Sequence, residues 1–341
     1  MSQLRVLLLV LIAGLLAWGG WSFFSPGTES QAPAPSYTPP ATDQPISPIP
    51  QHLQLDKRLV ALGRRLFHDP RLSHDDTISC ASCHLLTKAG ADAQPLAVGI
   101  GGQVSTVNTP TVFNSAFNFR QFWDGRAASL EEQAEGPIHN PVEMASNWRE
   151  VIAKLERDAD YPSEFAAIWP AAGKRAITAG HIQSAIAEFE RSLITPDAPF
   201  DRYLRGDPQA LSAAARQGWE LFRNLGCIAC HQGVNVGGNM YANLGVMGDY
   251  FADRGKPLLK SDLGRFNITG REEDRHLFKV PGLRNVERTA PYFHDGAIAT
   301  LDKAVDTMAR YQLGVSLSVE QRKALLAFLG SLNGTLPEAA P

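Results

Sequence analysis

The sequence CASCH at residues 80–84, with a second copy, CIACH, at residues 227–231, decides the class of this chain. In a CxxCH motif the two thiols lie on one side of a helical turn, where both can add to the vinyl groups of one haem. The histidine that follows then reaches the haem iron as an axial ligand. We therefore expect two covalently bound haem c groups, one at each motif.

The motif residues form two ligand sets. The first haem would be attached to Cys80 and Cys83, with His84 on its iron. The second set is Cys227, Cys230 and His231. The alternatives are a zinc site and a redox dithiol. However, the two CxxC pairs are much further apart than the ~15–20 residues typical of a zinc ribbon, and a redox dithiol does not require the histidine.

The composition is that of an ordinary globular protein. The chain has 341 residues, a length that favours two domains, and it is 44% hydrophobic and 20% charged. A formal net charge of −3 gives no indication of nucleic-acid binding. All four cysteines lie in the CxxCH motifs, so none remains for a structural disulfide.

The first 50 residues are expected to direct and tether the chain. An apolar run at 6–24 follows Arg5 and is about long enough to cross a bilayer. We expect 1–24 to be a signal anchor, with a cleaved signal peptide as the alternative. Residues 25–50 are rich in proline and predict an extended linker. Either alternative places the body in the periplasm, and an uncleaved anchor would hold it at the inner membrane.

Helical periodicity dominates the body, and no long alternating strand pattern occurs in the sequence. Three helix starts are predicted by capping-box pairs: Ser129 with Glu132, Asn147 with Glu150, and Ser318 with Gln321. We predict a mainly α fold made of two cytochrome c-like haem domains with long loops, at 51–205 and 206–341.

An internal repeat supports this division into two domains. The pattern G-x-x-L-F precedes both haem motifs, at 63–67 and at 218–222. Downstream, residues 109–130 and 280–301 align without a gap. We call two residues at aligned positions of this repeat "repeat partners".

The repeat predicts that the two irons differ. Met308 lies thirteen residues after Asp295 and is a candidate sixth ligand for the second haem, although a core methionine is the commoner fate of such a residue. A His/Met pair closes the iron and suits electron transfer. The same offset from Asp124 leads to Pro137, which has no donor for iron. We therefore expect the first haem to keep an open face that can bind a small molecule.

A reactive iron needs a group that moves protons. Gln133 and Glu143 lie near Pro137 in the sequence, and a helix break at Gly136–Pro137 would fold Glu143 back over the haem. A carboxylate there could carry a proton between the two oxygens of a peroxide. A solvated loop glutamate is the alternative, and spacing alone favours it.

A set of longer motifs resembles the bacterial dihaem cytochrome c peroxidases and the related MauG-type enzymes. The resemblance covers roughly residues 52–335 and is carried by CASCH, TPTVFNSAFNFRQFWDGR, EEQAEGPIHNPVEM, GCIACH, LRNVERTAPYFHDG and AVDTMARYQLG. It implies that the N-terminal domain is peroxidatic and that the C-terminal domain transfers electrons.

The resemblance also implies roles for individual residues. Glu143 would be the acid–base carboxylate and Gln133 its hydrogen-bonding companion. Trp123 would lie between the two haems and aid electron transfer. Met308 would be the distal ligand of the second haem, where MauG-type enzymes have a tyrosine. A calcium ion between the domains is implied as well, with Asn108, Thr289 and Pro291 at its ligand positions.

The sequence departs from the family pattern at one place. Many of these peroxidases carry a histidine in the loop after the first CxxCH, and this histidine caps the first iron until the second haem is reduced. Here no histidine occurs between His84 and His139, and Ile100 stands near the capping position. Our hypothesis is that the first haem is open at rest and that the enzyme needs no reductive activation.

The function expected from the sequence is a dihaem peroxidase that reduces hydrogen peroxide to water. Its electrons would come from a small cytochrome c or a cupredoxin, and the protein could form a homodimer. One alternative is a MauG-like oxidase that uses a stable high-valent state to modify a protein partner. The other is a dihaem electron carrier without enzymatic activity.

Overall fold

The computed structural model describes residues 45–337, which are mainly helical and fall within one unit of the chain. The segment predicted to be a signal anchor, 1–24, lies outside the described residues. Within the described part of the chain, no helix is both long enough and apolar enough to cross a membrane. The helices are α2 (Lys57–Phe67), α3 (Cys80–Cys83), α4 (Leu130–His139), α5 (Trp148–Leu155), α6 (Tyr161–Ile168), α7 (Ala179–Ser192), α8 (Pro199–Leu204), α9 (Ala213–Asn224), α10 (Tyr250–Asp253), α11 (Phe266–Thr269), α12 (Leu301–Leu313) and α13 (Val319–Gly330).

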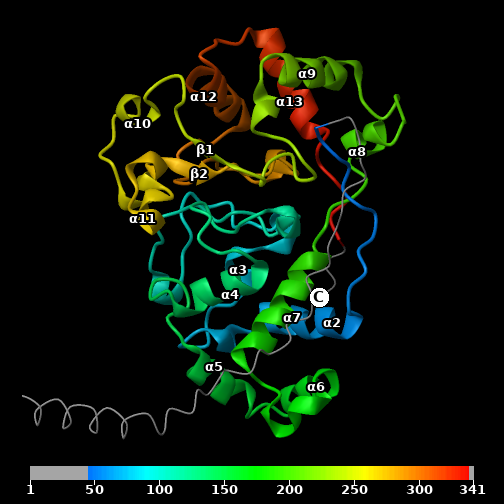
Figure 1. Cartoon of the computed structure of the whole chain (residues 1–341), viewed down its shortest axis with the longest axis vertical. Coiled ribbons are helices and arrows are strands. Elements are labelled where there is room, and N and C mark those ends of the chain that lie inside the picture. Colours follow the sequence, from blue (N-terminus) through cyan, green and yellow to red (C-terminus); the bar gives the residue numbers. More distant parts are fainter. Residues whose placement is uncertain (1–44, 338–341) are drawn as a thin grey trace, which may run out of the picture. The chain divides into compact units, whose positions relative to one another are not determined.

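Two helix pairs, α2 with α7 and α9 with α13, carry the two halves of the body (Figure 1). Each pair crosses at the glycine of the G-x-x-L-F pattern. A Cβ atom on Gly63 would lie 1.8 Å from the main-chain oxygen of Ala185, and one on Gly218 would lie 2.0 Å from that of Ala324. Only glycine allows the two backbones to approach this closely. The repeated glycine is therefore explained by helix packing.

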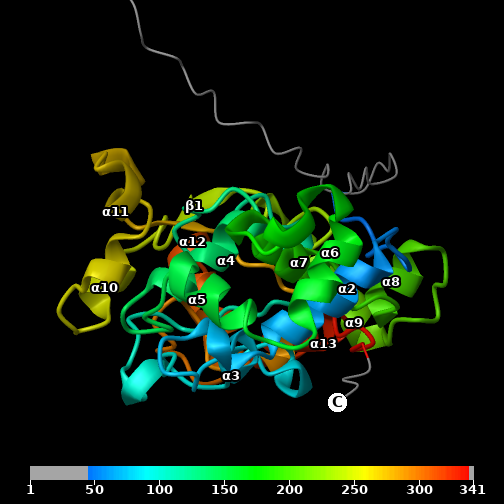
Figure 2. The same ribbon diagram turned by 90° about the horizontal axis from the view of Figure 1, so that it is seen from below.

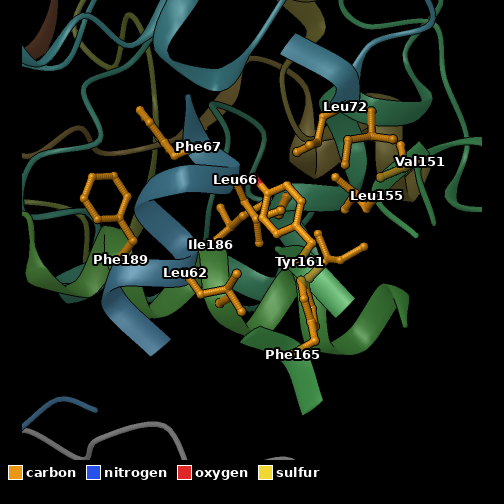
Figure 3. Close-up of a cluster of buried hydrophobic side chains, with 14 of the residues drawn as sticks. Leu62, Leu66, Phe67, Leu72, Val151, Leu155, Tyr161, Phe165, Ile186 and Phe189 are labelled. Carbon is orange, nitrogen blue, oxygen red and sulfur yellow. The ribbon is translucent and has the colours of Figure 1, made fainter. Parts of the chain in front are cut away.

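Each helix pair is part of a separate hydrophobic core. The first core lies between α2, α5, α6 and α7, and α4 also packs on α7 (Figures 2 and 3). The second core lies around α9 and α13, where the rings of Trp219, Phe222 and Phe328 pack together. The phenylalanine that ends each G-x-x-L-F pattern faces the motif histidine of its own half. The ring centroids of Phe67 and His84 are 6.5 Å apart, and those of Phe222 and His231 are 6.4 Å apart.

The three predicted helix starts are confirmed. The side chains of Ser129, Asn147 and Ser318 each accept a hydrogen bond from the main-chain N–H three residues further on. Such a cap satisfies one of the N–H groups that the first helical turn leaves unpaired. The reciprocal bond of a full capping box forms at Ser318, where Gln321 accepts from the Ser318 N–H.

The described residues include one small sheet. Strand β1 (Tyr241–Asn243) pairs antiparallel with β2 (Leu277–Lys279), and Tyr241 lies opposite Lys279. This ribbon places Phe278 and Lys279 beside the haem sites described below.

The body begins earlier than the linker boundary at residue 50 suggests. Ile46 and Ile49 are 1% and 0% exposed, and Ile46 is part of the second core. The N–H of Ile49 donates to the carboxylate of Asp201 at 3.2 Å. Residues 45–50 therefore pack with the C-terminal half, although their proline-rich composition predicts an extended linker.

The internal repeat is visible in the backbone. The repeat partners Asn114 and Asn285 are both fully buried and both left-handed, with φ of 60° and 59°. Their side-chain amides donate to the same hydroxyl oxygen, Oγ1 of Thr195, at 2.8 Å and 2.9 Å. One residue between the halves thus joins both copies of the repeat.

Candidate haem-binding sites

The first CxxCH motif forms a short helix whose histidine is held ready to bind a metal. Helix α3 spans Cys80–Cys83, and His84 follows it directly. The Nδ1 atom of His84 lies 3.1 Å from the main-chain oxygen of Gly90, which fixes Nδ1 as the donor and leaves Nε2 as the free nitrogen. Burial lowers the pKa of His84, so the ring is neutral at pH 7, as an iron ligand must be.

The second motif repeats this arrangement. Cys227–Ala229 forms a 3-10 turn, and the Nδ1 atom of His231 lies 3.3 Å from the main-chain oxygen of Val236. Burial lowers the pKa of His231 to about 4. Both motif histidines therefore present a neutral Nε2 to a neighbouring cavity.

The chemistry of the thiols does not fit a redox dithiol. Burial raises the pKa of Cys80 to about 12 and that of Cys83 to about 11. Reactive dithiols have lowered thiol pKa values, because the thiolate is the nucleophile. In addition, neither CxxC pair belongs to a cluster of three or more metal-ligating side chains within the described residues. These observations leave haem attachment as the chemistry that fits the motifs.

Each motif opens into its own cavity. The first cavity, of about 480 Å³, is lined by Cys80, Cys83 and His84, and the second, of about 410 Å³, by Cys227, Cys230 and His231. The lining of the second cavity is mainly apolar, which suits a porphyrin face. The residues present therefore fit two haem groups, one per cavity.

The residues expected to act in catalysis lie together at the first cavity. Gln133, Pro137 and Glu143 all line it, as does Trp123. Among the histidines at 45–337, His84 alone lines this cavity. The buried Met144 lines it as well, although its side chain belongs to the first core.

The Glu143 carboxylate is half-buried and bound by a neighbour that sequence reasoning missed. The side-chain amide of Asn140 donates to Oε1 of Glu143 at 2.7 Å. Burial raises the pKa of Glu143, whereas the positive charge of Arg126 and the Asn140 hydrogen bond act against this increase. Asn140 and Arg126 lie in the motifs NPVEM and WDGR, but nothing in their spacing links them to Glu143.

The turn that positions Glu143 differs from the expected helix break. Helix α4 continues through Pro137 and ends at His139. The chain then reverses at Asn140, whose main-chain oxygen accepts from the N–H of Glu143 at 3.1 Å. The prediction that the Gly136–Pro137 pair breaks the helix is therefore wrong. Glu143 still reaches the cavity, because the Asn140 turn makes the reversal.

The loop without a capping histidine packs directly on Glu143. The N–H of Ile100 donates to the main-chain oxygen of Glu143 at 2.9 Å, and Ile100 is 7% exposed. A Cβ atom on Gly99 would lie 2.1 Å from the main-chain oxygen of Val142. The backbone of this loop thus holds the Glu143 segment in place, and Gly99 lines the first cavity beside it.

The candidate ligand Met308 and its counterpart Pro137 lie at different cavities. Met308 is on α12 and lines the second cavity together with His231. Pro137 lines the first cavity together with His84. The equal offsets found in the sequence therefore lead to corresponding places in the structure.

Trp123 lies between the two sites, because it lines both cavities. Its indole Nε1 donates to the main-chain oxygen of Asn108 at 3.0 Å. Its repeat partner is His294, and the two rings meet edge to face. The hydrogen bonds around them are also paired. The main-chain N–H of Asn108 donates to the main-chain oxygen of His294 at 2.8 Å. Lys279 is the repeat partner of Asn108, and its main-chain N–H donates to the main-chain oxygen of Trp123, also at 2.8 Å.

The three residues expected at a calcium ion come from both halves and converge on the second cavity. Asn108, Thr289 and Pro291 all line it. The Asn108 amide nitrogen donates to the main-chain oxygens of Gln94 and Pro95, so its Oδ1 is left as an acceptor. A carboxamide and main-chain oxygens are hard donors of the type that calcium prefers.

An ionic cluster near Trp123 already has a cationic partner from the chain itself. Asp262, His294 and Asp295 lie close enough to hold a metal ion. However, Arg254 pairs with Asp262 at 2.6 Å and with Asp295 at 2.9 Å, and Nε2 of His294 lies 2.7 Å from Asp262. Burial favours a higher pKa for Asp262, but these hydrogen bonds hold it well below its usual value. The cluster is therefore an ion-pair network.

Comparison with known proteins shows the family to which the chain belongs. The family described as di-haem cytochrome c peroxidase matches residues 57–209. The cytochrome c peroxidase Ccp of Escherichia coli is 50% identical over 87% of this chain, which spans 62% of that relative's length. The cytochrome c551 peroxidase of Nitrosomonas europaea is 42% identical, with 87% of this chain and 86% of the relative covered. A solved MauG-like protein associated with microbial copper homeostasis superposes with a TM-score of 0.74 at 28% identity, covering 88% of this chain and 96% of that one.

The mainly helical fold and the two cavities, each lined by one CxxCH motif, fit a dihaem protein. The chain belongs to the dihaem cytochrome c peroxidase/MauG family and is a peroxidase-type oxidoreductase. Two haem c groups are the cofactors that this membership implies.

Proposed function

We propose that the chain reduces hydrogen peroxide to water at the first haem, with electrons that enter through the second haem. The observation that carries the proposal is the shared lining of the first cavity, where Glu143 and His84 meet the same space. Bound haem would supply an iron that holds peroxide and accepts electrons. The overall reaction takes one peroxide, two electrons and two protons to two waters.

Glu143 is proposed to move the proton. A carboxylate at the cavity can take the proton from one peroxide oxygen and return it to the other as the O–O bond breaks. The Asn140 amide fixes Oε1 at 2.7 Å and so orients the carboxylate. Gln133 lines the same cavity and is proposed to donate a hydrogen bond to peroxide or to Glu143.

The second haem is proposed to have His231 and Met308 as its axial ligands, whereas the first is proposed to have His84 alone. Support comes from the cavity linings, since Met308 lies at the second cavity and Pro137 at the first. Trp123, at both cavities, is proposed to aid electron transfer between them. A calcium ion at Asn108, Thr289 and Pro291 is proposed to hold the two halves together beside the second haem.

The direct test is turnover of peroxide by the haem-loaded protein with a reduced small cytochrome c or cupredoxin. We expect sustained oxidation of the donor, two electrons for each peroxide, without pre-reduction of the enzyme. Peroxide that leaves the spectrum of the oxidised protein unchanged would instead indicate a dihaem electron carrier. We propose a periplasmic location, where such donors occur, and a homodimer that light scattering would detect.

The MauG-like alternative rests on the missing capping histidine and on the MauG-like structural relative. An oxidase of that kind would show poor turnover with a reduced cytochrome and a long-lived oxidised state after peroxide. Met308 at the second cavity argues against it, because the MauG-type enzymes have a tyrosine at this position. The same turnover experiment therefore separates the two functions.

A further inference from the structure

The second cavity contains a buried positive charge without a negative partner. Lys279 ends strand β2, lines this cavity and is 7% exposed. No aspartate or glutamate among the described residues lines the second cavity. An isolated charge in such a place is costly unless an anion accompanies it.

The other charged groups at this cavity already have partners. Arg284 pairs with Asp201 at 2.7 Å, and His294 lies 2.7 Å from Asp262. For Lys279, in contrast, the described residues provide neither an ion pair nor a hydrogen bond to its ammonium group. Burial alone lowers the pKa of Lys279 to about 8. Lys279 is thus a cation that no side chain at 45–337 compensates.

We propose that the ammonium group of Lys279 pairs with a propionate of the second haem. Each haem brings two carboxylates, and this cavity offers them no competing acid of the protein. The inference rests on the second cavity holding a haem, as proposed above, but it does not depend on peroxide turnover. Lys279 is then a haem-binding residue of the C-terminal half.

The repeat makes this contact specific to one haem. The repeat partner of Lys279 is Asn108, which is neutral. The first cavity instead contains Arg126 and Lys260 together with the acidic Asp124, Glu143 and Glu190. A buried cation accompanied only by haem carboxylates is therefore a feature of the second site.

The pair has a consequence for the reduction potential. A positive charge close to haem favours the ferrous state, because reduction removes one positive charge from the iron. Replacement of Lys279 by an uncharged side chain also leaves a buried propionate unpaired, which favours the ferric state further. Both effects lower the midpoint potential of the second haem.

The test is a spectroelectrochemical titration of the haem-loaded Lys279→Met and Lys279→Arg variants. We expect Lys279→Met to lower the midpoint of the second haem while that of the first haem stays close to the wild-type value. Lys279→Arg retains the charge and should retain the midpoint. Lys303→Met, at an exposed lysine on α12, is the matched control and should change neither haem. A wild-type midpoint in Lys279→Met protein that carries two haems would overturn the proposal.

A second measurement compares the wild type with Lys279→Arg, which both carry a positive charge at position 279. It applies if Lys279→Met fails to fold or to load haem. In the wild type, the midpoint of the second haem should fall as the pH rises through the pKa of Lys279, because the ammonium loses its proton. The Lys279→Arg variant should show no such decrease, since a guanidinium stays charged there. Tyr241 lies opposite Lys279 in the ribbon, and Arg284 and His294 line the same cavity, so both proteins contain these neighbouring groups. Identical pH profiles for the two proteins would contradict the pairing.

Discussion

The rings of Trp123 and His294 meet edge to face, with their centroids 6.5 Å apart, and the two residues occupy equivalent positions in the repeat. Trp123 lines both cavities, and so does Asn108. The indole Nε1 of Trp123 donates a hydrogen bond to the main-chain oxygen of Asn108. His294 is held on its other side by Asp262. Under the proposed function, electrons that pass between the two haems would therefore meet a fixed aromatic pair.

Replacement of Trp123 by phenylalanine should slow transfer between the haems. The smaller ring loses the Asn108 hydrogen bond and part of the contact with His294. We expect kcat with a reduced cytochrome donor to fall roughly tenfold, which corresponds to about 1.4 kcal/mol in the barrier. Stopped-flow reoxidation of the second haem by peroxide measures the step directly. Trp148→Phe, in the same half but away from both cavities, is the control, and equal rates in the two variants would exclude this role for Trp123.

Replacement of Glu143 by glutamine should remove the proton-transfer group and leave the site intact. We expect kcat/KM for peroxide to fall by about 10²–10⁴-fold, the usual contribution of a general acid–base. The haem content and the optical spectrum of the ferric protein should stay unchanged. The exposed Glu135→Gln serves as the control. Wild-type peroxide kinetics in Glu143→Gln would rule out this carboxylate as the proton carrier.

The pH dependence follows from the same residue. Burial raises the pKa of Glu143, and only the carboxylate form can accept the peroxide proton. The rate with peroxide should therefore be lost as the pH falls through this raised pKa, because the carboxylate becomes protonated. An Asn140→Ala variant removes a hydrogen bond to the charged form, so its acid limb should move to higher pH. A pre-steady-state pH profile would show whether the limb moves, and an unchanged profile would contradict the assignment.

The first iron should be open in the ferric protein as isolated. Its cavity contains no histidine besides His84 within the described residues. Ile100 lies in the loop where the family resemblance implies a capping histidine. We expect a high-spin electron paramagnetic resonance signal from this haem and no lag in turnover. Met144→Leu should preserve that signal, whereas Ile100→His should add a low-spin species and a dependence on pre-reduction. A low-spin first haem in the wild type that becomes high-spin in Met144→Leu would identify Met144 as a ligand.

The helix crossings should be intolerant of any side chain. Gly63→Ala would place a methyl group 1.8 Å from the main-chain oxygen of Ala185, and Gly218→Ala would place one 2.0 Å from that of Ala324. Such overpacking costs about 1–3 kcal/mol of unfolding free energy. Gly330→Ala, at the end of α13 with its nearest neighbour 3.4 Å away, should change the denaturation midpoint little. Denaturant titrations of the three variants provide the comparison.

Sequence reasoning identified the parts of the sites that repeat. The CxxCH motifs, the doubled glycine and the equal offsets to Met308 and Pro137 all lie in patterns that occur twice, so each copy supports the other. Residues whose role depends on contacts or burial in the folded chain were missed. Arg126 and Asn140 act on Glu143 through space, and Lys279 acquires its character only from burial.

The linker boundary and the helix break show how local signals are overridden. Proline at residues 45–50 predicts an extended chain, but Ile46 and Ile49 become buried against the C-terminal half. Pro137 predicts a break, yet α4 continues to His139. In both cases tertiary packing decides the outcome, and composition or a single proline cannot reveal it.

The hydroxyl of Thr195, shared by Asn114 and Asn285, makes the two copies of the repeat interdependent. Gly334 holds the same position relative to Asn285 as Thr195 holds relative to Asn114, because the main-chain N–H of each donates to the Oδ1 atom of that asparagine, at 3.1 Å and 2.9 Å. A Cβ atom on Gly334 would lie 1.9 Å from the main-chain oxygen of Thr195. The two equivalent positions therefore differ in role. Thr195 provides the shared hydroxyl, and glycine at position 334 leaves room for the main chain of Thr195. A C-terminal half produced alone would lack the hydroxyl that accepts from the Asn285 amide, so this half depends on a residue outside it.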